Sequence, residues 1–218
     1  MNPDSERLYT SNDLNTSLTN TPTTPMEAYW ISKALARLAT KTFKQTHANT
    51  PHFDYVNLLP GVVIGPDDRL IPSQTNKDIS ANDVLEGTRA AVLAPALTKE
   101  ISSPFPYVNV PVHVADVARA HVDAVDAGVV EGDREYILCS SGSGEDVEWD
   151  RDVRGVVRRW FPEEVEMGMF PLLGGLGTVK WRVDGGETER VFGWRFRGFE
   201  ETVKGLVAQW LELGGGRS

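Results

Sequence analysis

The sequence predicts an α/β protein with a largely parallel sheet, because short strand-like runs alternate with segments of helical periodicity. The run at 53–60 is compact and apolar and is bounded by proline and glycine, which favours a buried strand over a helix. The run at 134–140 is a second short strand. The chain has 218 residues, enough for one domain with a sizeable core, or for one domain and a small lobe.

The elements are expected in a definite order. Residues 1–25 are polar and lack periodicity, so they predict an irregular lead-in. From Met26 to about Gln45 apolar residues recur at helical spacing, and Pro25 stands where a helix can start. The expected elements after the strand at 53–60 are a helix over 82–98, an edge or irregular strand over 107–114, a helix over 115–128 with a left-handed cap at Gly128, a strand over 134–140, a loop over 141–146, a helix over 147–161 stopped by Pro162, a flexible glycine-rich segment over 169–181 and a helix over 199–213.

Composition excludes several classes of partner. A net charge of -9 argues against nucleic acid or an anionic membrane surface, because both attract clustered lysine and arginine. Cys139 is the one cysteine, so an internal disulfide is excluded. The first residues do not resemble a signal peptide, and no apolar run approaches the roughly 18 residues of a membrane span. A cytoplasmic location is the expectation, and no cluster of metal ligands is visible.

Tyr29 and Lys33 are the first candidates for chemistry. They stand four residues apart on the predicted helix, so their side chains share a face. A nearby ammonium group favours the phenolate form of a tyrosine, so such a pair can pass a proton to or from a carbonyl or alcohol oxygen. The spacing alone is a weak signal, and an ordinary surface helix with a solvated lysine explains it as well.

Further motifs follow the pair in a fixed order: NLLPGVVIGP at 57–66, VPVHVADVARAH at 110–121 and WRVDGGETERVFGWRFRGFEETV at 181–203. With the lead-in LYTSNDLN at 8–15, they resemble the extended short-chain dehydrogenase/reductases. The resemblance is greatest to the branch of dihydroflavonol reductases, cinnamoyl-CoA reductases and fungal aldehyde/ketone reductases. The extended short-chain dehydrogenase/reductases are in turn similar to the NAD-dependent epimerase/dehydratases.

The resemblance implies roles for particular residues. Tyr29 would give its proton to a substrate carbonyl, and Lys33 would favour the phenolate and hold the nicotinamide ribose. Pro60 and the backbone of Gly61, Val62 and Val63 would lie against the nicotinamide ring and its carboxamide. The implied cofactor is NADP(H), or NAD(H), and the implied partner is a small-molecule ketone or aldehyde.

The sequence departs from this family in what it lacks. The resemblance implies a Rossmann-like, doubly wound parallel sheet with a small substrate-binding lobe. However, the first strands, the glycine-rich turn that holds the pyrophosphate and the strand with a catalytic serine or threonine have no counterpart. Residues 26–218 would then be a partial domain of an N-terminally truncated member. We expect an exposed sheet edge at 53–60 and an exposed helix face, both open to association with another chain.

Alternatives remain for the function and for several residues. The chain can be a carbonyl reductase, a sugar-nucleotide epimerase/dehydratase, a hydroxysteroid dehydrogenase, or a non-catalytic remnant that binds no dinucleotide. His113 and Asp116 are expected to act locally, with Asp116 accepting from free amides at a helix start. Five residues are candidates for either the substrate pocket or the core: Met167, Met169, Phe170, Leu172 and Leu173.

Overall fold

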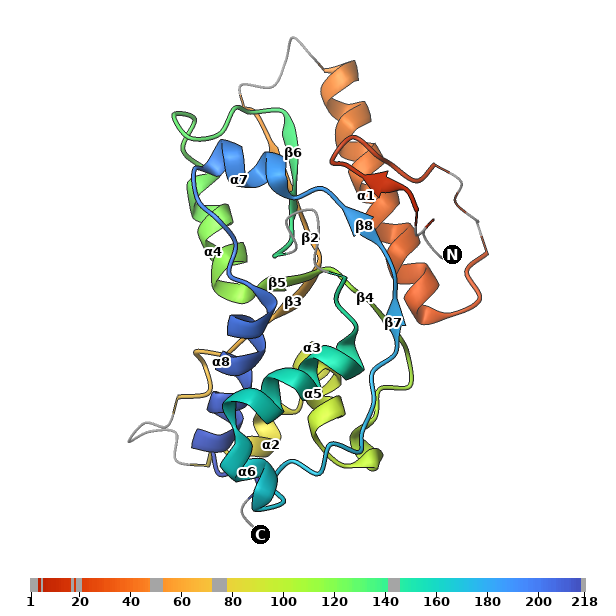
Figure 1. The fold of residues 1–218 in the computed structure, drawn as a ribbon. Coiled ribbons are helices and arrows are strands. Elements are labelled where there is room, and N and C mark those ends of the chain that lie inside the picture. The colour runs from red at the N-terminus through yellow and green to blue at the C-terminus, as the bar shows by residue number, and fades with distance from the viewer. Residues whose placement is uncertain are drawn as a thin grey trace.

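A computed structural model describes residues 4, 6–16, 18, 21–47, 53–71, 78–140 and 146–216 of the chain (Figure 1). Its helices are α1 (Pro25–Thr46), α2 (Ala81–Val84), α3 (Gly87–Leu93), α4 (Val114–Asp123), α5 (Trp149–Trp160), α6 (Pro162–Glu166), α7 (Gly186–Phe192) and α8 (Phe199–Glu212), with 3-10 turns η1 (Ala94–Ala96) and η2 (Lys99–Ile101). Its strands are β1 (Leu8–Tyr9), β2 (Val56–Pro60), β3 (Val62–Ile64), β4 (Tyr107–Val108), β5 (Pro111–His113), β6 (Arg134–Leu138), β7 (Thr178–Val179) and β8 (Arg182–Val183).

The described strands form four pairs, and every pair is parallel. β2 pairs with β6 along its five residues, and β3 pairs with β5 along three. The short pairs are β1 with β8 and β4 with β7. Parallel neighbours need long connections between them, and here helices supply much of that length. The prediction of an α/β fold with parallel pairing is therefore confirmed.

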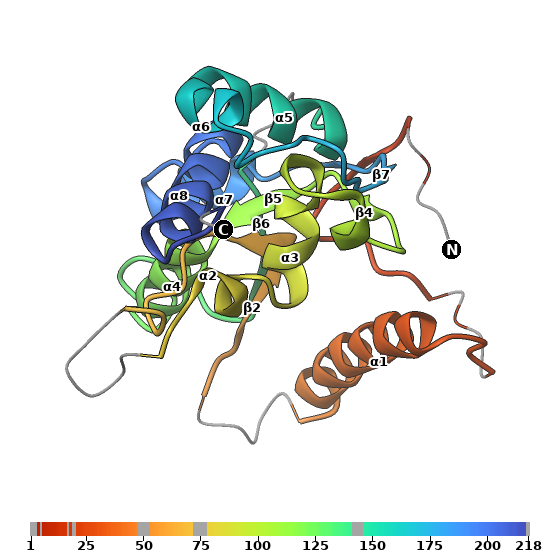
Figure 2. The same cartoon turned by 90° about the horizontal axis from the view of Figure 1, so that it is seen from below.

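The β2–β6 pair lies between α1 and α4 (Figures 1 and 2). Side chains alternate between the two faces of a strand, so neighbouring β2 residues point to different helices. Val56 and Leu58 pack into an apolar cluster that includes Ala120 of α4. Asn57 points to the other face, where its side-chain amide donates to Glu135 on the α1 side.

The main core lies at the other end of the molecule, where α2, α3, α5 and α8 pack together beside β3. Trp149 of α5 is fully buried, and its ring meets Phe199 of α8 edge-on at 5.7 Å. Phe170 is also buried and packs 5.2 Å from the ring of Trp210. This core holds the α5–α8 side of the fold independently of α1.

Helix α1 begins as the sequence predicts, with Pro25 in its first turn. The Thr24 hydroxyl accepts a hydrogen bond from the Glu27 amide at 3.1 Å, and the Glu27 carboxylate accepts from the Thr23 amide at 2.7 Å. These reciprocal bonds satisfy amides that the helix itself leaves unpaired. Although α1 has 22 residues, neither it nor any other described helix is long and apolar enough to cross a bilayer.

Two predicted helices have different limits in the structure. The single helix expected over 82–98 is broken, because the chain leaves α2 after Val84 and restarts at Gly87 with a φ of 53°. The helix expected over 115–128 ends at Asp123, and Gly128 is not its left-handed cap. Instead, the Gly128 amide donates to the Asp126 carboxylate at 2.8 Å, so a local turn takes the place of the expected cap.

Three further segments differ from expectation. Pro162 ends α5 as predicted but also starts α6, because proline suits the first turn of a helix. The segment 169–181, expected to be flexible, is held by backbone hydrogen bonds and contains β7; the Leu173 amide donates to the Leu97 carbonyl at 2.9 Å. The lead-in, expected to be irregular, contains β1, because it reaches β8 far along the chain. The loop expected over 141–146 falls mostly outside the described residues.

Candidate active site

Tyr29 and Lys33 lie one turn apart on α1. The Lys33 Nζ is 5.4 Å from the centroid of the Tyr29 ring, within the range of a cation–π contact. Tyr29 is 53% exposed. The two side chains do lie together on the helix, and their catalytic role stays a prediction.

Lys33 begins a row of basic residues along one side of α1: Arg37, Lys41 and Lys44. Arg37 Nη2 and Lys41 Nζ lie 2.5 Å and 2.7 Å from Glu135 Oε2 on β6. Residues four apart on a helix differ by roughly 40° around its axis, so Tyr29 is roughly 80° from Arg37. The ion pairs with Glu135 turn Arg37 towards the sheet and leave Lys33 and Tyr29 roughly 40° and 80° around the helix from it.

Glu135 is the centre of this ion network. Its side chain is only 7% exposed, and it also accepts a hydrogen bond from the Asn57 amide at 2.9 Å. Burial acts to raise the pKa of the Glu135 carboxyl, but hydrogen bonds from Arg37, Lys41 and Asn57 lower that pKa to about 2. Arg37 reaches further and donates to the Asp13 carbonyl at 2.6 Å. One arginine thus joins α1, β6 and the lead-in.

The network also sets the height of Tyr29 relative to the sheet. Lys44, near the end of α1, donates to the Phe53 carbonyl before β2 begins, so the helix and the strand run in opposite directions. From Arg37, Tyr29 is about 12 Å along the helix axis at 1.5 Å per residue. From Asn57 at the level of Glu135, Pro60 is about 10 Å along the strand at 3.3 Å per residue. The Tyr29 end of α1 and the carboxyl end of β2 therefore lie at a similar level.

The segment from Pro60 to Val63 is fixed by its backbone. The Gly61 amide donates to the Leu138 carbonyl at 3.0 Å, and the Val62 amide donates to the Val110 carbonyl at 2.7 Å. These two amides are therefore used within the fold, and the contact of this segment with a nicotinamide ring stays a prediction. Backbone groups alternate along a strand, so the Val63 amide faces away from β5. A Cβ on Gly61 would lie 2.1 Å from the Val110 carbonyl oxygen, which explains the glycine.

His113 acts locally, as expected, whereas Asp116 has a different role from the one expected. The His113 Nδ1 caps α4 by accepting from the Ala115 amide at 3.0 Å. Asp116 does not accept from amides at the helix start; it accepts from the Arg197 amide at 2.7 Å and pairs with its guanidinium at 2.5 Å. Burial lowers the pKa of His113, and the positive charge of Arg197 lowers it further. The neutral His113 ring that caps α4 also packs beside Gly65, in the turn that follows β3.

The residues that were candidates for pocket or core divide between the two environments. Phe170 is buried in the main core, and Met169 and Leu172 pack against it. Met167 and Leu173 are 63% and 67% exposed. None of the five has a recorded contact with α1 in the described structure, and Phe170 in particular is a core residue.

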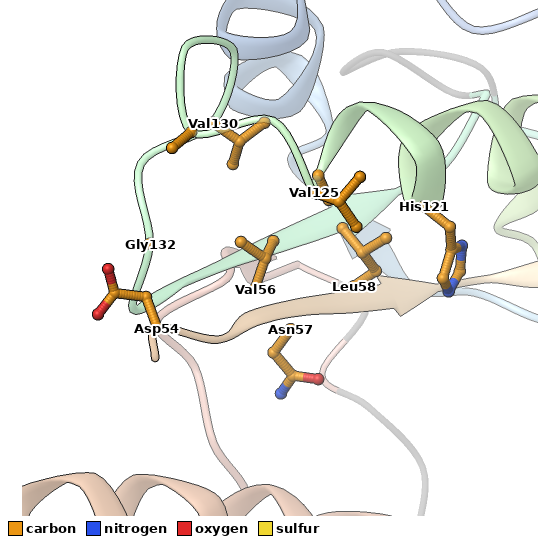
Figure 3. Close-up of a pocket in the computed structure, with 10 residues that line it drawn as sticks. Asp54, Val56, Asn57, Leu58, His121, Val125, Val130 and Gly132 are labelled. Carbon is orange, nitrogen blue, oxygen red and sulfur yellow. The ribbon is translucent and has the colours of Figure 1, made fainter. Parts of the chain in front are cut away.

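A groove of about 620 Å³ lies on the other face of β2, between this strand and the end of α4 (Figure 3). Its lining includes Val56, Leu58, His121 and Val125 but none of the predicted site residues. The His121 Nδ1 is 2.7 Å from the Val117 carbonyl, a bond within α4. The groove is therefore separate from the Tyr29–Lys33 site. Among the described residues no group of three or more His, Cys, Asp or Glu side chains is placed to hold a metal ion.

Sequence reasoning missed the Glu135 network. Two signals were present: basic residues at four-residue spacing after Lys33, and a single acidic residue inside the strand run REYIL. Of the hydroxyl residues near the pair, Thr23 and Thr24 serve the start of α1. Ser11 donates to Glu187 at 3.3 Å. These hydrogen bonds give Thr23, Thr24 and Ser11 structural roles and no catalytic one.

Comparisons with known proteins bear on the family. No family model matches the sequence. The ketoreductase CTB6 of Cercospora nicotianae is 33% identical over 169 residues, which cover 75% of this chain and 43% of the relative. The chain belongs to the extended short-chain dehydrogenase/reductases. Another member of the family, the NAD-dependent epimerase/dehydratase ALT6 of Alternaria alternata, is 28% identical over 198 residues, covering 86% of this chain and 51% of the relative.

Solved structures agree on the fold. The structure of yeast methylglyoxal/isovaleraldehyde reductase Gre2 complexed with NADPH matches with a TM-score of 0.67 and 21% identity, over 95% of this chain and 58% of that one. Vestitone reductase from alfalfa matches with a TM-score of 0.64 and 18% identity, over 95% of this chain and 59% of that one. The family prediction is confirmed, in the branch of the fungal ketoreductases. The chain spans about half the length of the curated relatives it matches.

Proposed function

We propose that this chain carries the proton-donating part of an NADP(H)-dependent carbonyl reductase, with Tyr29 as the proton donor and Lys33 as its partner. The observation that supports this most directly is the position of the pair. It lies on the flank of α1 next to the sheet-facing Arg37, at a similar level to Pro60. The ketoreductases among the relatives favour a carbonyl substrate, and the NADPH in the Gre2 structure favours that cofactor.

The described residues fit the nicotinamide end of such a cofactor. The carboxyl end of a parallel strand is where α/β proteins bind ligands, and exposed Pro60 and the Val63 amide stand at that end of β2. The Lys33 ammonium is on the same side and would donate to ribose hydroxyls. The sequence contains no Gly-x-x-Gly-x-x-Gly turn. We therefore assign pyrophosphate binding to the part of the relatives' length that this chain does not span.

The chemistry assigned to this chain is a proton transfer. When bound, the nicotinamide supplies the hydride that reduces the carbonyl carbon. The Tyr29 hydroxyl donates a hydrogen bond to the carbonyl oxygen and gives up its proton as the alcohol forms. The Lys33 ammonium, 5.4 Å from the ring centroid, stabilises the phenolate that remains. In this proposal residues 26–218 form one partial domain, and 1–25 lead into it.

Two alternatives compete with the reductase. An epimerase or dehydratase is supported by the relative ALT6, but its 28% identity is lower than the 33% of the ketoreductase. A non-catalytic remnant that binds no dinucleotide is supported by α1, in which no residue is buried. A helix without a buried residue orders the pair less firmly than a packed helix would.

Titration with reduced nicotinamide mononucleotide tests the proposal, because this half-cofactor needs no pyrophosphate turn. We expect a saturable shift of the Val63 amide signal in NMR spectra of the chain, and a roughly tenfold weaker affinity after Lys33→Met, equivalent to about 1.4 kcal/mol. Lys180→Met, at an exposed lysine paired with Asp146, is the matched control and should bind as the unsubstituted chain does. No shift at Val63, or an equal affinity for Lys33→Met, would favour the remnant.

A further inference from the structure

We propose that Asn109 is a specificity-determining residue, whose side-chain amide donates a hydrogen bond to a second oxygen of the ketone substrate. The substrate class that follows is a ketone carrying a further carbonyl group. This inference rests on the proposed function for the nature of the ligand. Its test, however, is measured at Asn109 and needs no chemistry at Tyr29.

Asn109 lies where the carboxyl ends of two strands meet. The β3–β5 register pairs Val62 with Pro111, so Asn109, two residues before Pro111, is level with Pro60. The Ser140 amide, just after β6, donates to the Pro111 carbonyl at 2.8 Å. β5 therefore begins beside the carboxyl ends of both β2 and β6. In α/β proteins such strand ends are where ligands bind.

One end of the Asn109 side chain is fixed and the other is free. Its Oδ1 accepts from the Trp181 amide at 2.7 Å, and its backbone amide donates to the Val179 carbonyl at 3.0 Å. No described residue accepts a hydrogen bond from its Nδ2, although Asn109 is only 5% exposed. The described side-chain atoms that are both unpaired and fully enclosed are the indole nitrogens of Trp181 and Trp210, so the Asn109 Nδ2 still reaches the surface. A nearly buried donor without a protein acceptor favours a ligand that offers an oxygen.

The apolar cluster that contains Trp181 borders this free amide. Tyr9, Leu59 and Val108 pack in the same cluster and remain partly exposed. The Tyr9 ring meets the Trp181 ring edge-on at 5.8 Å, which holds the indole in place. A largely apolar surface with a few placed polar groups is typical of a site for a small organic molecule.

The free amide lies on the same side of the sheet as Tyr29. Leu59 is two residues after Asn57 on β2, so both side chains point towards α1. Trp181, whose amide binds Asn109, packs in the cluster of Leu59. Figure 1 shows β4 and β7, which flank Asn109, at the height of the beginning of α1. A ketone bound between them would meet Tyr29 with one oxygen and Asn109 with another.

The carboxamide of the nicotinamide is the competing ligand for this amide. In the proposed function the nicotinamide lies against Pro60 and the residues that follow it. The Asn109 side chain, however, is bonded to Trp181 in the segment between β7 and β8, and not to this turn. The free amide therefore lies beside the proposed position of the nicotinamide, where the substrate would be held.

NMR titration of the full chain tests the inference. The probes are diacetyl, acetylacetone and acetonylacetone, whose two carbonyl groups are adjacent or are separated by one or two carbons. We expect at least one of them to give a saturable shift of the Asn109 side-chain amide signals. It should also bind at least tenfold more tightly than the mono-ketone with the same number of carbons: butanone, methyl propyl ketone or methyl butyl ketone.

A matched pair of substitutions isolates the donor. Asn109→Asp keeps the oxygen that accepts from Trp181 but replaces the free donor by an acceptor oxygen. It should lower the affinity for the diketone at least tenfold. Asn82→Asp makes the same chemical change at an exposed position of α2 and should bind as the unsubstituted chain does. If the carboxylate of Asn109→Asp unfolds the chain, the shift of the Asn109 signals in the unsubstituted chain still tests the inference.

Three results would overturn the inference. The first is no shift at Asn109 with any of the three diketones. The second is equal affinity for each diketone and its mono-ketone. The third is a shift of the Asn109 side-chain signals by reduced nicotinamide mononucleotide instead of the diketones, because it assigns this amide to the cofactor.

The signals of Asn109 and Val63 separate the two proposals. A response of Asn109 to a diketone, without a response of Val63 to reduced nicotinamide mononucleotide, would retain the binding role of Asn109 while the proposed function fails. A response of Val63 to the mononucleotide, without a response of Asn109 to any diketone, would retain the proposed function alone.

Discussion

Replacing Glu135 by glutamine removes the negative charge that attaches α1 to β6 while keeping the size of the side chain. In the described structure α1 buries none of its residues, and ion pairs and hydrogen bonds to Glu135 attach it to β6. We expect Glu135→Gln to loosen α1 without unfolding the α5–α8 core. Glu131→Gln is the matched control, because Glu131 forms an exposed ion pair with Arg134.

The size of the effect follows from the pKa of the carboxyl. The pKa of Glu135 falls from 4.5 to about 2, and each unit corresponds to about 1.4 kcal/mol, so the network favours the charged form by about 3 kcal/mol. The side chain is only 7% exposed, so little of this is screened by water. An exposed pair such as Glu131–Arg134 contributes about 0–1 kcal/mol.

The contribution of Glu135 also depends on pH in a defined direction. Its carboxyl pKa is lower in the folded protein than in the unfolded chain, so the stabilisation is fully present above about pH 4.5. It is lost as the pH falls from there towards about 2. The difference between the protein and Glu135→Gln should therefore be constant near neutral pH and should shrink below pH 4.5.

Native-state hydrogen exchange measures this effect element by element. In Glu135→Gln the α1 amides should exchange faster by an amount corresponding to about 2–3 kcal/mol, while the α8 amides remain unchanged. Glu131→Gln should change neither helix by more than about 0.5 kcal/mol. The reasoning is refuted if the α1 amides exchange equally in the two variants, because α1 would then be held by something other than Glu135.

Three further predictions concern the turn, the core and the helix cap. Gly61→Ala should destabilise the protein by about 1–3 kcal/mol in urea unfolding, because its Cβ would lie 2.1 Å from the Val110 carbonyl oxygen; a neutral result would exclude this close approach. Phe170→Ala should lower the free energy of unfolding by about 3–5 kcal/mol, and Leu173→Ala, at an exposed site, by less than about 0.5 kcal/mol. A larger loss for Leu173→Ala than for Phe170→Ala would contradict the assignment of Phe170 to the core. Burial lowers the pKa of His113, so the free energy of unfolding should fall as the pH drops below 6.5. His113→Asn keeps a capping oxygen and should remove this part of the pH dependence. The same dependence of stability on pH in His113→Asn would contradict this role of His113.

The elements that sequence predicts well are those whose causes lie within a few residues. Helix α1 is an example, because Thr24, Pro25 and the apolar spacing all act locally. The strands at 53–60 and 134–140 were also predicted from their own composition and flanks, and β2 and β6 lie within them. The Tyr29–Lys33 proximity followed directly from helical geometry.

The features that sequence did not predict depend on distant partners. The lead-in becomes a strand only because β8, more than 170 residues later, lies beside it. Asp116 stands where a helix-start residue would, but Arg197 brings a stronger donor from another element. Glu135 is separated from Arg37 by 98 residues, so its partner is visible only in three dimensions.

The rate of NADPH oxidation in the presence of a ketone tests the central claim that Tyr29 is the proton donor; it is measured on the chain mixed with the separately produced part of the Cercospora nicotianae ketoreductase that the match leaves out. We predict that Tyr29→Phe lowers this rate by about a hundred- to ten-thousand-fold, the usual contribution of a positioned acid. Tyr55→Phe, just before β2, should retain the full rate. A Tyr29→Phe variant that reduces the ketone as fast as the unsubstituted protein would contradict the claim.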